Sequence, residues 1–127
     1  MERIAIEYYK SGYNCSQCIL KAAAERFNFA LPKQCLKMCT SINNGFGIKS
    51  TCSVLVACIM CLGLIFNEQS AKRLRIKFLN EFNAKYNSLN CSRLKIENSS
   101  DYKCEKIVGD AAALLENIII NERRNFL

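Results

Sequence analysis

Apolar side chains recur every three or four positions along most of the chain, which is the spacing of one face of an α-helix. The same period runs through residues 2–11, 15–28 and 102–123. The clearest stripe, in residues 68–87, consists of Ala71, Leu74, Phe78, Phe82 and Tyr86. The alternation typical of β-strands is weak throughout. The pattern therefore predicts an all-α protein.

Residues 52–66 form an apolar run that carries no charge. A helix of this length spans about 22 Å, which is less than the roughly 30 Å of a bilayer core. We therefore expect a buried central helix and no membrane span. A further helix is predicted at about 32–41, with Pro32 in its first turn. Together these segments predict one domain over residues 1–127, a compact bundle of about five to six helices around the central one.

Several predicted helices begin next to a side chain that can cap free backbone N–H groups. These capping residues are Asn14, Thr51, Asn67 and Asp101. The main predicted loop covers residues 42–51 and contains Gly45 and Gly47. Both glycines permit a positive φ or a close approach of the backbone to a neighbour.

Cysteine and histidine usage limits the chemistry of the protein. The 127 residues include nine cysteines and no histidine. The lack of histidine excludes Cys₂His₂ zinc fingers, His-ligated haem and nucleophile–histidine pairs. The N-terminal residues do not form a signal peptide, and an odd number of cysteines leaves one thiol outside any full disulfide set. We therefore expect a cytoplasmic protein with a thiol or metal site.

The net charge of +7 permits an anionic partner, but the basic residues are spread along the chain. The densest run, residues 72–77, lies within an amphipathic helical pattern and is better interpreted as a solvated helix face. No aromatic–basic platform or nucleic-acid motif is present, so we expect no nucleic-acid partner. The aromatic side chains could face a second copy as well as a core, which leaves a homodimer open.

Four of the cysteines stand at or near predicted helix starts, beside a capping residue. They are Cys15, Cys52, Cys91 and Cys104. The positive end of a helix favours anions, so we expect these thiols to have a lowered pKa. The other five lie inside predicted helices, where cysteine behaves as a small hydrophobic residue: Cys18, Cys35, Cys39, Cys58 and Cys61. The four are far apart in sequence, so only the fold could gather them. On spacing alone, most of them could equally be ordinary core residues.

Short motifs accompany these cysteines. They are Gly12-Tyr13-Asn14-Cys15, Gly45-Phe46-Gly47, Leu62-Gly63-Leu64, Leu89-Asn90-Cys91 and Asp110-Ala111-Ala112. Over nearly the whole chain, these motifs resemble the C_GCAxxG_C_C family of redox-active proteins. The chain departs from the family at Ser53, Val54 and Ala57, which replace Gly, Ala and Gly of its named element. The loop before Cys52 is also shorter than in the family.

The resemblance implies a redox function. It implies that Cys15, Cys52, Cys91 and Cys104 hold an iron–sulfur cluster, which exchanges single electrons with a redox partner protein. One alternative is a metal-free thiol–disulfide oxidoreductase, in which Cys15 attacks and Cys18 or a distant cysteine resolves. Another is a structural zinc site formed by the same four thiolates. No nucleotide-binding or hydrolytic motif is present, so no substrate is assigned.

Overall fold

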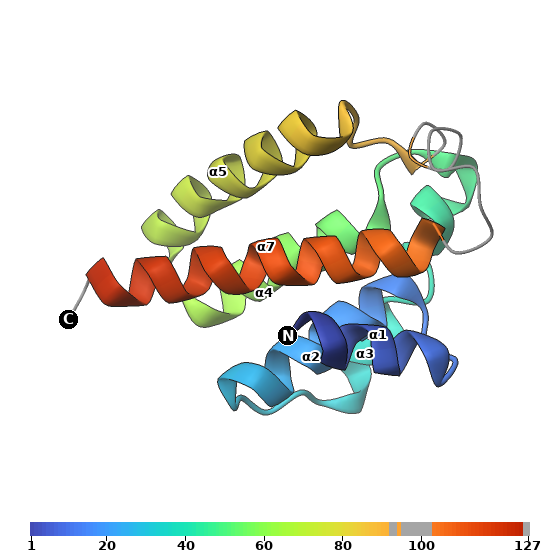
Figure 1. The fold of residues 1–127 in the computed structure, drawn as a ribbon. Coiled ribbons are helices and arrows are strands. Elements are labelled where there is room, and N and C mark those ends of the chain that lie inside the picture. The colour runs from blue at the N-terminus through green and yellow to red at the C-terminus, as the bar shows by residue number, and fades with distance from the viewer. Residues whose placement is uncertain (92–93, 95–102, 126–127) are drawn as a thin grey trace.

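The computed structural model describes residues 1–91, 94 and 103–125, and this part of the chain is all-α (Figure 1). The helices are α1 (Glu2–Lys10), α2 (Cys15–Phe27), α3 (Lys33–Met38), α4 (Ser53–Ile65), α5 (Glu68–Tyr86) and α7 (Lys103–Asn125). A short turn, η1 (Gly45–Lys49), precedes α4. The predicted fold class is confirmed, and the predicted ends of α1, α2 and α5 agree to within one residue.

Helix α4 lies at the centre of the fold and contacts α2, α5 and α7. Its uncharged sequence follows from this position, since Leu55, Cys58 and Leu62 are fully buried. Burial ends at Leu64, which is 59% exposed. The predicted central helix is therefore confirmed. In the described residues, no helix combines the length and the apolar character needed to cross a membrane.

The long helix α7 runs between α5 on one side and α1, α2 and α3 on the other (Figure 1). The predicted stripe of α5 is buried, and the Phe82 and Tyr86 rings stack with their centroids 4.8 Å apart. The Tyr86 hydroxyl donates a hydrogen bond to Asp110 of α7. The Tyr86–Asp110 bond therefore joins α5 to α7 near the end of the stripe.

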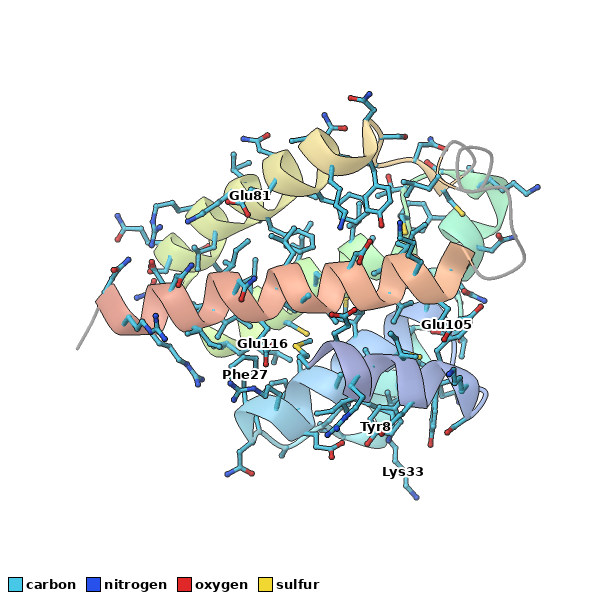
Figure 2. All side chains as sticks on the ribbon, viewed as in Figure 1. Tyr8, Phe27, Lys33, Glu81, Glu105 and Glu116 are labelled. Carbon is cyan, nitrogen blue, oxygen red and sulfur yellow. The ribbon has the colours of Figure 1, made fainter. Side chains whose placement is uncertain are left out.

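An ion-pair cluster centred on Glu116 joins the other side of the bundle to α7 (Figure 2). The Glu116 carboxylate accepts hydrogen bonds from Arg26 of α2 at 2.6 Å and from the amino group of Met1 at 3.1 Å. Burial raises the pKa of Glu116, but the hydrogen bonds from Arg26 and the amino group outweigh it and lower the pKa overall. One carboxylate thus ties α1 and α2 to α7.

Two of the predicted caps are confirmed. The Asn14 side chain accepts from the Gln17 N–H at 2.9 Å, and the Gln17 side chain accepts from the Asn14 N–H, which completes a capping box. The Asn67 side chain accepts from the Ser70 N–H at 2.9 Å and starts α5. The predicted cap at Asp101 lies outside the described residues.

Two other local predictions are wrong. Thr51 does not cap α4, because it pairs with Asn90 in an isolated antiparallel bridge and the N-cap is Cys52. The third helix is also shorter than predicted, since Pro32 is its N-cap and Cys39 its C-cap. The Cys39 N–H bonds to the Leu36 carbonyl three residues back, which tightens and ends the last turn.

Candidate functional site

The four cysteines at predicted helix starts line one cavity. Its volume is about 290 Å³, close to the lower end of the range for small-molecule and cofactor sites. The complete wall consists of Cys15, Asn43, Asn44, Cys52, Ser53, Val54, Cys91, Leu94, Cys104 and Ile107. No acidic or basic side chain of the described residues belongs to this wall. The fold thus brings distant thiols together in a neutral environment.

Cys15 and Cys104 lie at the starts of α2 and α7, and both are half-buried. The Cys104 thiol is the neighbour that most strongly raises the pKa of the Cys15 thiol, so the two thiols lie close together. The Asn14 cap fixes the start of α2, and its side-chain amide also reaches the Cys39 carbonyl at 3.5 Å, which links it to the end of α3. Glu105, labelled in Figure 2, marks the end of α7 where Cys104 lies.

Cys52 and Cys91 are placed by two backbone segments that run antiparallel. The Cys52 N–H donates to the Leu89 carbonyl at 3.0 Å, and the Cys91 N–H donates to the Ser50 carbonyl at 2.6 Å. These bonds flank the bridge that displaced the predicted Thr51 cap. The two cysteines are only 7% and 6% exposed. This pair therefore forms the buried side of the cavity.

Gly45 permits the close packing behind Cys91. It has a φ of +60°, and a Cβ atom added to it would lie 2.5 Å from the Ser50 nitrogen and 2.8 Å from the Cys91 Cβ. Neither neighbour is the flexible end of a side chain, so another residue would require the backbone to shift. The predicted role of this glycine in close backbone approach is confirmed.

Cys15 and Cys52 do not have the lowered pKa that their helix positions predicted. Contact with Cys104, together with burial and the neighbouring thiols, raises the pKa of Cys15 far above its ordinary value. Burial raises the pKa of Cys52 to about 11, although the N–H groups of Val54 and Leu55 face its sulfur and oppose the rise. Desolvation and mutual repulsion thus outweigh the helix ends, so Cys15 and Cys52 are neutral thiols at pH 7 unless a cation joins them.

The remaining cysteines do not line the cavity. Cys18, Cys58 and Cys61 are fully buried and Cys35 is half-buried, and all four lie inside helices as predicted. Cys39 is fully buried as well, but it follows α3 as its C-cap and does not lie inside the helix. The Cys18 thiol donates to the Tyr13 carbonyl at 3.6 Å, and burial raises its pKa to about 12. The thiol that most strongly affects Cys15 is therefore that of Cys104 and not that of Cys18.

Sequence reasoning missed three residues near the cavity. Asn43 and Asn44 belong to its wall, and Asn44 has a left-handed backbone with a φ of +59°. The Asn-Gly pair at 44–45 was the available signal, since asparagine tolerates this conformation and the pair is typical of turns. Tyr9 of α1 lies near Cys15 and Cys104, and burial with these thiols raises its pKa. No pattern in the sequence linked Tyr9 to the cysteines.

The side chains that line the cavity limit which metal ions or clusters it could bind. Among the described side chains, no three cysteine or carboxylate groups converge closely enough to hold a metal ion. Four thiolates without histidine or carboxylate are the ligands of Cys₄ zinc sites and of iron–sulfur clusters.

One comparison with known proteins finds a match. The family model "Putative redox-active protein (C_GCAxxG_C_C)" matches residues 13–118, a range that includes all four cavity cysteines. No curated protein and no solved structure matches the chain.

Proposed function

The chain belongs to the C_GCAxxG_C_C family of redox-active proteins, and from this we propose that its four cavity cysteines hold an iron–sulfur cluster. The ligands are Cys15, Cys52, Cys91 and Cys104. The observation that carries the proposal is that these four thiols, and no charged group of the described residues, line one cavity. When bound, the cluster supplies one-electron redox chemistry.

The four proposed ligands form two pairs that differ in exposure. Cys52 and Cys91 are buried, and backbone hydrogen bonds across the Thr51–Asn90 bridge hold them. Cys15 and Cys104 are half-buried and stand at helix starts. The free N–H groups there favour the negative charge that thiolate ligands bring.

Ligand binding at this site also requires proton release. Burial and thiol contacts raise the pKa of Cys15 and Cys52, so both thiols carry protons at neutral pH. Only a deprotonated thiol binds a metal. Loading therefore displaces protons, and it should become more favourable as the pH rises from 6 to 8.

The test is anaerobic reconstitution with iron and sulfide, followed by chemical analysis and a visible spectrum. We expect bound iron and sulfide in the natural protein and a marked loss in each single Cys→Ser variant of the four ligands. Cys35→Ser is the matched control, because Cys35 is half-buried but does not line the cavity. A colourless, iron-free natural protein would contradict the proposal, as would equal loss in the Cys35 variant.

A second candidate is a metal-free dithiol, favoured by the proximity of the Cys15 and Cys104 thiols on the wall of one cavity. In this reaction the two thiols form one S–S bond, and two electrons and two protons pass to a disulfide substrate, which becomes two thiols. Mass spectrometry after mild oxidation with glutathione disulfide tests it. A reversible Cys15–Cys104 disulfide in a protein that never binds iron would favour this candidate over the cluster. Stoichiometric zinc without iron would favour a structural metal site.

A further inference from the structure

The turn beside the cavity exposes two large apolar side chains. Phe46 is 45% exposed and Ile48 is 79% exposed, and Gly47 lies between them. The turn borders the cavity, because Asn44, the residue before η1, belongs to the cavity wall and Gly45 packs against Cys91. The two apolar side chains therefore belong to the same surface turn that contributes to the cavity wall.

The backbone of this turn is strained. Asn44, Gly45, Phe46 and Gly47 are consecutive left-handed residues, with φ values of 59°, 60°, 64° and 79°. This conformation is disfavoured for a bulky residue such as Phe46. Phe46 nevertheless remains 45% exposed. Strained residues of this kind cluster at active sites, ligand clamps and switch regions.

The surroundings of the turn in the sequence are basic. Residues 27–67 contain three lysines and no Asp or Glu, and the whole chain has a net charge of +7. One of these lysines, Lys49, ends the turn and is exposed. A protein with an acidic surface would be attracted to this region, and a basic one would be repelled.

We infer that Phe46, Ile48 and Lys49 form the docking surface for a small acidic electron-carrier protein. The inference rests on the proposed redox function, and it specifies the partner of that site. An apolar centre with a polar rim is the usual composition of a protein interface. Two exposed apolar side chains and one lysine indicate a small, transient contact, as in other electron-transfer pairs. A carrier bound to these side chains would lie next to the cavity, because Asn44 of the same segment lines the cavity and Gly45 packs against Cys91.

The test measures binding of named carriers to the full chain by NMR titration at low and high salt. The acidic probes are a plant-type ferredoxin and a flavodoxin, and the basic probe is a cytochrome c. We expect an acidic probe to bind, with affinity that falls as salt increases. Ile48→Ser and Lys49→Glu should each weaken this binding about fivefold or more.

The matched controls are Ile76→Ser and Lys77→Glu on α5, where Ile76 is 54% exposed and Lys77 is exposed, and neither residue lines the cavity. These controls should leave binding within about twofold, and circular dichroism should show all four variants folded. Equal weakening by the controls, equal binding of cytochrome c, or no binding of either acidic probe would overturn the inference. So would a dimer that Ile48→Ser converts to monomer, which would assign the turn to self-association.

Iron and sulfide are measured on every sample, which separates this inference from the cluster proposal. An iron-free protein that still binds the acidic carrier through the turn would support the docking surface and contradict the cluster proposal. A cluster-loaded protein that binds neither acidic carrier would support the cluster proposal and contradict the docking surface.

Discussion

Replacing Gly45 with alanine tests the close packing behind the cysteine cavity. The new Cβ would lie 2.5 Å from the Ser50 nitrogen and 2.8 Å from the Cys91 Cβ, and the backbone would remain at a φ of +60°. The left-handed conformation costs alanine about 1–2 kcal/mol, and overpacking costs a further 1–3 kcal/mol. We therefore expect Gly45→Ala to lower the free energy of unfolding by about 2–5 kcal/mol.

Gly47 provides the control for backbone conformation alone. It has a φ of +79°, but a Cβ added there would meet no atom within 4 Å. Gly47→Ala should therefore cost only about 1–2 kcal/mol. Urea unfolding of both variants gives the two free energies, and iron analysis after reconstitution reports on the cavity. We expect Gly45→Ala to lose iron and Gly47→Ala to keep it. Equal destabilisation, or full iron content in Gly45→Ala, would refute the claim that Gly45 positions Cys91.

Three further predictions concern stability. Glu116→Gln should cost about 1–3 kcal/mol in urea unfolding, because it removes the carboxylate that holds Arg26 and the Met1 amino group; an unchanged midpoint would contradict this. Asn67→Ala should cost about 1 kcal/mol through the lost helix cap without changing iron content, and a loss of iron would show that its effect reaches the cavity. Raising the pH should destabilise the iron-free protein, because the pKa of Cys52 rises on folding from 9.0 to about 11, so the folded state binds more protons in that window. The contribution of the Cys52 thiol to the free energy of unfolding is constant below pH 9 and decreases by up to about 1.4 kcal/mol per pH unit above it. A free energy of unfolding that stays constant to pH 10.5 in a urea series would contradict this.

The sequence was sufficient for features that depend on neighbouring residues. The caps at Asn14 and Asn67 form because a side chain reaches an N–H only three residues away. The stripe of α5 follows from helical periodicity, and its residues are buried as predicted. The central position of α4 follows from its uncharged sequence, because a helix that is apolar on all sides is stable mainly where neighbouring helices cover most of it. Each of these results needs no knowledge of distant contacts.

Features that depend on distant segments were predicted less well. Thr51 has the chemistry of a cap, but pairing with Asn90, almost forty positions away, gives its backbone a different partner. The direction of the thiol pKa shifts was wrong for the same reason. A helix start was visible in the sequence, whereas the contact of Cys15 with Cys104 and the burial of Cys52 were not. The four cavity cysteines could be named in advance because each stands near a capping residue at a predicted helix start, and the family resemblance marks the same four. Their ligand role remains a prediction.

The left-handed turn could be predicted only in part from the sequence. Gly45 and Gly47 indicated positive φ, and both have it. Phe46 also has a positive φ, which no propensity would assign to a bulky residue. The hydrogen bond from the Ser50 N–H to the Gly45 carbonyl, at 2.8 Å, closes the turn around it. This constraint comes from the packing of the turn against the segment of Cys91, so it was not visible in local sequence.

Mass spectrometry of alkylated cysteines, in protein with and without reconstituted iron and sulfide, tests the four-cysteine site most directly. Each cysteine then reports its own protection from iodoacetamide under mild unfolding conditions. We predict that loading protects Cys15, Cys52, Cys91 and Cys104 together, while the labelling of Cys35 is unchanged. Protection of a different set, or iron binding that leaves any of the four as reactive as before, would contradict a cluster held in this cavity.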